Sequence, residues 1–213
     1  IIEKVYVREG DAVSEGAVLI SLDPTQAKSL YGEVKKEERS LMIRVERLRA
    51  EREGREPVFS YELMRDDAEL IEAEKSQLQE RKKALESELQ LLRSQVDQRY
   101  EEREQAIAEL VRAEIEYDLS SQEFVLIKNL VDRLLEARLS LISAEREKNE
   151  ALAKLNTAKV AVKRADAVLA EANFRLSQAK MNFMSEVGNE LASSLARLSE
   201  KRERLNGLGE RLN

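Results

Sequence analysis

Cysteine, histidine and tryptophan are absent from the 213 residues, and the chain has only 2 Pro, 7 Gly and 4% aromatic residues. The absence of thiols and imidazoles excludes disulfides, zinc fingers and histidine acid–base catalysis. The scarcity of aromatic and turn residues argues against a compact globular enzyme, which needs aromatic mass and many chain reversals to close a core. The missing cysteines do not fix the compartment, because a chain without thiols tolerates an oxidising one.

Two further features are absent, a long apolar run and a bias towards one sign of charge. No stretch approaches the roughly 18 apolar residues that a membrane span needs. The 36 basic and 42 acidic residues are interspersed and give a net charge of −6, so we expect no nucleic-acid partner. The chain opens on Ile1-Ile2-Glu3 without Met or a signal peptide, and we expect it to be an excised piece whose membrane anchor lies outside it.

Composition and periodicity favour long helices. Hydrophobic residues make up 42% and charged residues 37% of the chain, with the rich Ala, Glu, Lys, Leu and Arg content of coiled coils. Thr25 is a plausible N-cap, and apolar residues recur after it at intervals of three, four or seven. We predict a first helix over 25–53, ended by Gly54 to Pro57, and a second that begins at Ser60. The packing of the first helix does not follow from the sequence, because its length exceeds what a two-armed hairpin needs.

Two heptad series follow, and neither Gly nor Pro occurs between Pro57 and Gly188. In each series apolar residues alternate at spacings of four and three, which is typical of a coiled-coil seam. Arg99 and Arg103 interrupt the first seam, and they either pair across to the second arm or face neighbouring hairpins. The first series contains Leu78, Leu85, Leu89, Leu92, Val96, Ala106, Leu110, Ala113, Tyr117 and Phe124, and the second contains Ala151, Leu155, Ala158, Val162, Ala165, Leu169, Ala172, Leu176, Ala179 and Phe183.

Residues 125–145 carry too many apolar side chains for a two-faced helix. The seam register also shifts across this stretch, so we place a tight helix–helix turn near 132–136. The prediction is an antiparallel hairpin of helices 60–131 and 136–206, with arms of about 100 Å. Because no Gly or Pro marks the turn, one continuous helix in a parallel dimer is the alternative.

The two ends of the chain carry different signals. Residues 1–24 are the only part that resembles strands, with apolar runs separated by glycine turn signals, and two or three short strands cannot bury a core alone. Gly207 and Gly209 are predicted to end the last helix at residue 206. Gly188 costs about 1 kcal/mol relative to Ala inside a helix and is a candidate hinge, with a local surface irregularity as the alternative.

No group of residues predicts catalysis or a bound cofactor. Acidic side chains on solvated heptad positions are expected of any coiled coil, and no pair is singled out as an acid–base dyad. The sequence has neither a Gly-rich phosphate loop nor a cluster with metal-ligand spacing. Glu9-Gly10-Asp11 lacks the spaced oxygens of a calcium loop and is interpreted as a turn. We therefore expect no enzyme activity, no cofactor and no metal.

The segment from Val7 to Leu19, VREGDAVSEGAVL, resembles the lipoyl/biotinyl pattern, in which a Gly-Asp turn, a Val and a second Gly precede a strand. Carrier domains with this pattern continue into a hairpin whose Lys takes the cofactor. Leu22 to Thr25 stands in that place here, and the next Lys after this segment is Lys28. We therefore expect a half-barrel without cofactor attachment.

A half-lipoyl motif that runs into a long helical hairpin resembles the HlyD family of periplasmic adaptor (membrane fusion) proteins, in particular its type I secretion branch. In that family the segment matching residues 130–138, LVDRLLEAR, is the hairpin tip. Leu134 stands where many members have Gly. Leu126 and Ala137 replace an Arg and a Ser of the multidrug-efflux branch, which points away from that branch.

The resemblance implies a mainly α fold, in which a long antiparallel coiled-coil hairpin over 25–206, with an extra N-terminal helix, stands on a partial β lipoyl-like half-domain over 1–24. Residues 207–213 would return towards the second lipoyl half. It also implies an inner-membrane anchor and a position in the periplasm of a Gram-negative bacterium. The implied partners are an inner-membrane ABC transporter, a TolC-type outer-membrane channel, an exported protein substrate and further copies in a homo-oligomer, a hexameric ring.

The tip residues take their roles from the same resemblance. Apolar side chains would match grooves in the coiled coils of the channel, and arginines would add charge-assisted contacts. The channel-docking residues predicted in this way are Leu130, Arg133, Leu134, Leu135, Arg138 and Leu139. The alternative is that the leucines pack together to close the turn. Two other functions stay open, an adaptor for drug or peptide efflux and a coiled-coil scaffold outside transport.

Overall fold

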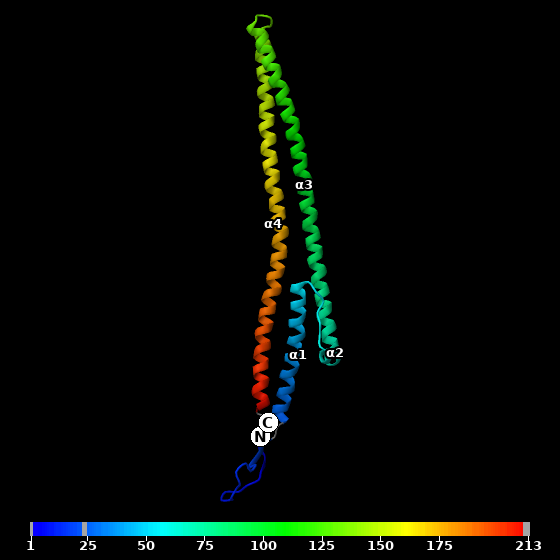
Figure 1. Cartoon of the computed structure of the whole chain (residues 1–213), viewed down its shortest axis with the longest axis vertical. Helices are drawn as coiled ribbons and strands as arrows, with labels where there is room; N and C mark the ends of the chain where they lie inside the picture. Colours follow the sequence, from blue (N-terminus) through cyan, green and yellow to red (C-terminus); the bar gives the residue numbers. More distant parts are fainter. Residues whose placement is uncertain (1, 23–24, 211–213) are drawn as a thin grey trace. The chain divides into compact units, whose positions relative to one another are not determined.

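The computed structural model describes residues 2–22 and 25–210 and is mainly helical (Figure 1). Its elements in chain order are β1 (Ile2–Val5), β2 (Ile20–Leu22), α1 (Thr25–Glu53), α2 (Tyr61–Asp66), α3 (Ala68–Asp132) and α4 (Arg138–Glu210). The chain divides into two compact units. We call residues 1–83 together with 183–213 the three-helix unit, and residues 84–182 the hairpin unit.

In the hairpin unit α3 and α4 run antiparallel, joined by residues 133–137 (Figure 1). The predicted hairpin is confirmed, and the alternative of one continuous helix is wrong. Arg103 Nε donates a hydrogen bond to Asp166 Oδ1 across the two helices at 2.6 Å. Of the two roles left open for the seam arginines, Arg103 therefore takes the cross-arm pair, while Arg99 pairs with Glu102 of its own helix at 2.6 Å.

The seam of the hairpin unit is thin because alanine fills many of its positions. Ala113 of α3 is buried against Leu155 and Ala158 of α4. Ala144 and Ala151 are buried further along α4. Small side chains let two helices approach closely, but they bury little apolar area per residue.

In the three-helix unit α1 contacts α4 on one side and the α2–α3 segment on the other. Its aliphatic residues point in both directions, so that Ile43 and Leu48 are both fully buried. This arrangement explains the length of α1, for which the sequence offered no packing partner. The three clusters are Val45, Leu48, Val187, Leu191 and Leu198; Ile43, Phe59, Leu63 and Ile71; and Val34, Leu205 and Leu208.

A buried ionic network joins the same three helices. Arg47 is 0% exposed; its Nη1 donates to Glu51 Oε2 at 2.7 Å and its Nε donates to Glu74. Arg81 then links Glu51 to Glu190, at 2.8 and 2.7 Å. Burial raises the pKa of Glu51, although the charges of Arg81 and Arg47 act in the opposite direction.

The second predicted helix is broken in two at Asp67. Ser60 is the N-cap of α2, and its Oγ accepts a hydrogen bond from Leu63 N at 3.4 Å. Arg39 of α1 forms ion pairs with Asp66 and Asp67, at 3.3 and 3.2 Å. Packing against α1 therefore produces a break that the local sequence does not mark.

The last helix continues through Gly207 and Gly209, beyond its predicted end. Each glycine costs about 1 kcal/mol relative to alanine. Leu205 and Leu208 of the same turn are buried against α1, and this burial offsets the cost. Residues 211–213, part of the predicted return to the strands, lie outside the described residues.

The strands β1 and β2 form an antiparallel pair in which Val5 lies opposite Ile20. Between them Gly10 and Gly16 have φ values of +97° and +83°. Each is the third residue of a hydrogen-bonded turn, a position where positive φ favours glycine. A pair of short strands does not establish a lipoyl-like half-domain, which stays a prediction.

Candidate functional site: the hairpin tip

A Schellman motif ends α3 and begins the turn to α4. Leu134 N donates to Val131 O and Leu135 N donates to Leu130 O, both at 2.9 Å, which satisfies carbonyls that the helix end leaves open. Leu134 takes the left-handed position of the motif, with φ +61°. That conformation costs a non-glycine residue about 1 kcal/mol. The turn thus holds a leucine where glycine is the unstrained choice.

Glu136 organises the other side of the turn. Its Oε1 accepts hydrogen bonds from Ser140 Oγ at 2.8 Å and from Ala137 N at 3.3 Å. Both bonds favour the carboxylate and hold the pKa of Glu136 below its ordinary value, with Ser140 the larger cause. α4 begins at Arg138, two residues later than predicted, and Glu136 precedes the helix as part of its cap.

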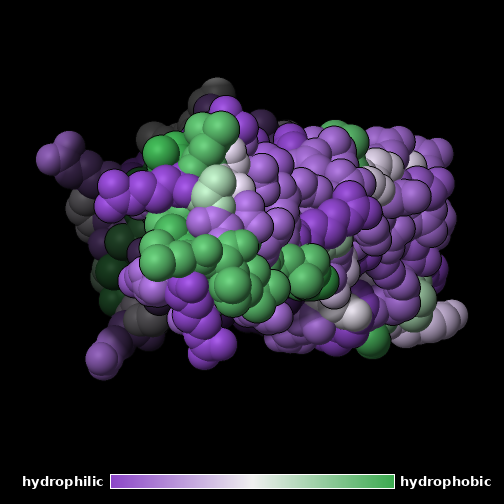
Figure 2. All heavy atoms as spheres, turned by 90° about the horizontal axis from the view of Figure 1, so that it is seen from above, coloured by the Kyte–Doolittle hydropathy of each residue, from purple (hydrophilic) through white to green (hydrophobic). Residues whose placement is uncertain are grey.

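Apolar side chains gather at this end of the hairpin unit and remain exposed (Figure 2). Leu134 is 92% exposed, Leu139 74% and Leu135 68%. Leucines that closed the turn would be buried, so the exposure of these three favours the docking interpretation, which stays a prediction. Leu130 is half-buried, and its carbonyl accepts the hydrogen bond from Leu135 N.

Three exposed apolar residues beside the turn were not among the predicted docking residues: Val125 and Leu126 of α3 and Ile142 of α4. The sequence did contain a signal for them, because they belong to the apolar excess over 125–145 that predicted the turn. Together with the three exposed leucines of the turn, they form what we call the tip surface: Val125, Leu126, Leu134, Leu135, Leu139 and Ile142.

Arg133 and Arg138 are exposed at the two ends of the turn, and neither has an ion-pair partner among the described residues. Their guanidinium groups are therefore available for charge-assisted hydrogen bonds to a partner's carboxylates or carbonyls. A contiguous apolar area next to unpaired arginines is typical of a protein–protein interface.

A shallow hollow of about 420 Å³ lies on α3 next to the tip surface. It is lined by Ser121, Gln122, Val125, Leu126 and Asn129. Ser121 Oγ is buried there without a hydrogen-bond partner. Val125 and Leu126 of this lining also belong to the tip surface, so the hollow adjoins it directly.

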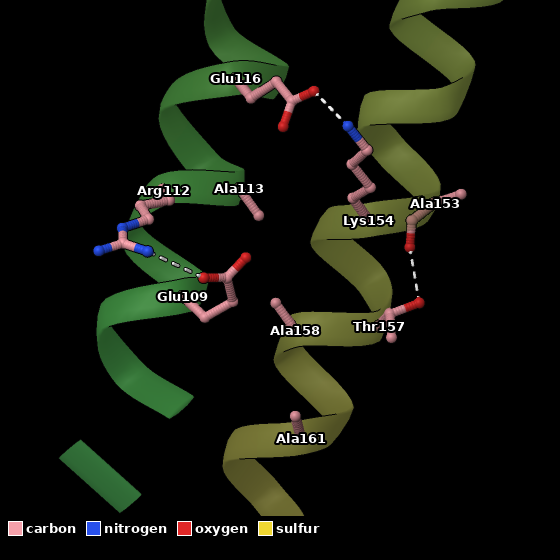
Figure 3. A pocket seen from close by; sticks show the side chains of 9 residues that line it. All are labelled: Glu109, Arg112, Ala113, Glu116, Ala153, Lys154, Thr157, Ala158 and Ala161. Atoms are coloured by element: carbon pink, nitrogen blue, oxygen red, sulfur yellow. Dashed lines mark hydrogen bonds and ion pairs between the residues drawn. The ribbon is translucent and has the colours of Figure 1, made fainter. Parts of the chain in front are cut away.

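A second hollow, of about 430 Å³, lies on the α3–α4 seam, where alanines leave room (Figure 3). Its charges are paired: Lys154 Nζ lies 2.6 Å from Glu116 Oε1, and Arg112 Nη1 lies 3.4 Å from Glu109 Oε2. The hollow therefore suits a side chain better than a charged ligand.

Within residues 2–22 and 25–210 no group of acidic residues has metal-binding geometry, and no helix is long and apolar enough to cross a membrane.

Gly188, the predicted hinge, lies in an unbroken stretch of α4 in the three-helix unit. Val187 beside it is fully buried, and Leu191 is buried one turn later. A Cβ at Gly188 would meet nothing within 4 Å, so space does not require a glycine. An unbroken helix does not test bending, and the hinge stays a prediction.

Comparison with known proteins identifies the family. The sequence matches the model of the family "AprE, long alpha-helical hairpin" over residues 27–211. The soluble domain of LipC, a membrane fusion protein of a type I secretion system, has a similar structure, with a TM-score of 0.81 and 22% identity over 99% of this chain and 82% of that chain. The periplasmic adaptor protein EmrA is also similar, with a TM-score of 0.52 and 18% identity over 99% of this chain and 57% of that chain.

A search of curated proteins finds no match to the sequence. At identities of 22% and 18% the structural likenesses establish the fold. The family model spans nearly the whole chain, from the start of α1 to the end of α4. The chain therefore belongs to the AprE family of long α-helical hairpins, and its fold is that of the soluble domain of a membrane fusion protein.

Proposed function

We propose that this chain is the periplasmic hairpin part of an adaptor in a type I secretion system, with a non-enzymatic role. It joins an inner-membrane ABC transporter to a TolC-type outer-membrane channel, through which a protein substrate is exported. Membership of the AprE family supports the adaptor role, and the likeness to the LipC domain supports the secretion branch.

The exposed tip surface carries this proposal. Leu134, Leu135 and Leu139 stand in solvent, and Leu134 also adopts a strained backbone conformation. Burying one leucine side chain stabilises a complex by about 1.5–3 kcal/mol. Coiled coils of a channel present grooves of the kind that receive such side chains, and Arg133 and Arg138 add directional contacts.

In the same proposal β1 and β2 belong to the first half of a lipoyl-like domain, and the adaptor forms a hexameric ring. The paired strands and the two glycine turns support the first point. The ring places several tips on one channel, so that weak individual contacts act together. The protein works in the periplasm of a Gram-negative bacterium and is anchored to the inner membrane.

Site-specific cross-linking in the intact system tests the docking. These 213 residues contain no cysteine, so single cysteines at Arg133 and Arg138 are the only thiols in this part of the protein. Gln105, exposed on α3 in the hairpin unit, is the matched shaft position. We expect the two tip variants to cross-link to the outer-membrane channel in cells with an active transporter, and the Gln105→Cys variant not to do so.

Equal cross-linking from the tip and the shaft, or none from either in a folded, exported protein, contradicts tip docking. The coiled-coil scaffold outside transport would then become the better interpretation. A second candidate is an adaptor for drug or peptide efflux, because the fold is shared with more than one periplasmic adaptor, EmrA among them. Deleting the protein separates the two: a secretion adaptor loses an exported protein from the medium, whereas an efflux adaptor loses resistance to small molecules.

A further inference from the structure

The buried ionic network of the three-helix unit holds more carboxylates than arginines. Glu51 of α1 lies at its centre, and its side chain is only 3% exposed. The two cations are Arg47, fully buried, and Arg81, mostly buried. Three carboxylates share these two cations, because Glu74 pairs with Arg47 and Glu190 pairs with Arg81. The network therefore carries one negative charge in excess, in a place largely closed to water.

The position of Glu51 in its helix adds to the cost of that charge. Glu51 lies in the last turn of α1, where the open carbonyl groups of a helix end already present a partial negative charge. Whether the arginines offset it depends on the groups of all three helices. The charged groups that face Glu51 or its arginines are Arg47 of α1, Glu74 and Arg81 of α3, and Glu186 and Glu190 of α4.

Burial and neighbouring charge act together on Glu51. Burial is the largest influence and raises the pKa of its carboxyl group. The charge of Glu190 raises this pKa further, whereas the charges of Arg81 and Arg47 lower it. In the fold the pKa lies above its ordinary value of 4.5. Because the groups interact closely, a proton taken up here belongs to the whole network and not to Glu51 alone.

We infer that the network takes up one proton as the pH falls, and that this proton strengthens the packing of α1 between α3 and α4. A proton removes the excess charge, binds to a single oxygen and needs no additional space. A metal cation would instead be repelled by the guanidinium groups that stand between the carboxylates. This proton lock regulates how firmly α1 is held; it goes beyond the proposed function and does not depend on it.

The direction of the pH effect follows from proton binding in the two states. Well below the ordinary value of 4.5 the carboxyl group is protonated whether or not α1 is packed. Between that value and the raised pKa only the packed state holds the proton, so packing weakens as the pH rises, and above the raised pKa the contribution is lost. The direction is opposite for Glu37 of the same helix, whose pKa is lowered by the hydrogen bond from Lys201.

Hydrogen–deuterium exchange of the full-length protein, resolved by peptide, measures how firmly α1 is held. Glu190→Gln is the test variant, because glutamine keeps an oxygen for Arg81 and leaves two carboxylates for two arginines. The exchange rate of α1 peptides in the native chain is divided by the rate in the variant at the same pH, which cancels the intrinsic pH dependence of exchange. We expect this ratio to rise at least about twofold from pH 4.5 to about pH 8.

Glu186→Gln is the matched control. It removes the same charge from the same helix and beside the same arginine, but Glu186 is 65% exposed and its Oε1 lies 3.6 Å from Arg81 Nη2. The ratio of native to control exchange should not change with pH. The quantity compared is the change of each ratio with pH, so a packing defect that acts at every pH does not imitate the effect.

A ratio for Glu190→Gln that stays constant or falls as the pH rises would overturn the proton lock. An equal rise for Glu186→Gln would overturn it too, because the effect would then come from surface charge on α4 and not from the buried network. Neither result alters the tip experiment, since channel cross-linking does not measure the packing of α1.

Discussion

The three-helix unit and the hairpin unit share the helices α3 and α4 but differ in how they are stabilised. The three-helix unit buries Ile43, Leu48 and Val187 completely and encloses an arginine network. The hairpin unit buries mainly alanines along a two-helix seam and leaves bulky aliphatic residues outside. A third helix therefore supplies burial in one unit, and the other unit retains apolar surface that partners can cover.

Each unit contains a helix that ends in the same turn motif, and the residues in the left-handed position of that motif show the same contrast. Gly54 ends α1 with φ +70°, and Leu134 ends α3 with φ +61°. Both motifs use the same two hydrogen bonds, from the left-handed residue and from the residue after it. Glycine, the unstrained choice, stands in the three-helix unit, whereas at the tip a leucine is held in strain and in solvent. Stability governs the first position, and we attribute the second to docking.

The largest expected effect is in the three-helix unit. Arg47→Ala leaves the buried Glu51 side chain and the partly buried Glu74 short of a partner, so we expect a loss of about 3–5 kcal/mol in the free energy of unfolding. Urea unfolding followed by circular dichroism measures it. Arg44→Ala, on an exposed neighbour in the same helix, should change stability by less than about 0.5 kcal/mol. A loss of equal size in both variants would remove the special role of the network.

The next largest effect comes from truncating one core leucine in each unit, and we expect the loss of stability to differ between the units. Leu48→Ala opens a cavity in a buried cluster and should lower the free energy of unfolding by about 3–5 kcal/mol. Leu155→Ala truncates a residue in the seam between only two helices and should lower it by about 2 kcal/mol. The same unfolding experiment compares them. Equal losses would show that the alanine seam is packed as rigidly as the three-helix core.

Substituting the left-handed residue of each turn should change the free energy of unfolding in opposite directions. Leu134→Gly relieves a left-handed leucine and should stabilise the protein by about 1 kcal/mol, and Gly54→Ala should destabilise it by a similar amount. Unfolding midpoints measure both. If Leu134→Gly also weakens channel cross-linking while it stabilises the fold, the strained leucine serves docking; unchanged cross-linking would argue against that role.

Gly188→Ala should stabilise α4 by about 0.5–1 kcal/mol, because the added methyl group meets nothing and alanine is the better helix former. Whether α4 bends at Gly188 is tested separately, by measuring export of the substrate. If Gly188 is a hinge, the variant should be more stable but export less substrate. Normal export with the added stability would rule the hinge out and leave a surface irregularity.

The smallest expected effect concerns pH at the tip. The pKa of Glu136 is lowered in the fold, so its capping of α4 is fully present above the ordinary value of 4.5 and is lost as the pH falls through the lowered value. Helical NMR shifts at Ser140 should decrease over that acidic range. Glu136→Gln should flatten the change; a variant that keeps the full pH response would show that another group is responsible.

Periodicity predicted much of this architecture correctly, because a heptad predicts a seam, and a shift of register across an apolar-rich stretch favours a turn. The α1 bounds coincide with the predicted 25–53 because Thr25 and Gly54 provide local start and stop signals. The break at Asp67 and the continuation through Gly207 could not be predicted in this way. Both depend on packing against α1, whose partners are far away in the sequence.

The sequence by itself determined that the chain is built of long heptad helices without thiols or imidazoles, since composition and spacing depend only on which residues follow one another. Only the tertiary structure decided which leucines stand in solvent, which arginine crosses the seam and which is buried. Exposure depends on what the neighbouring helix covers, and Leu130 and Leu134 look alike in sequence although one is half-buried and the other is 92% exposed.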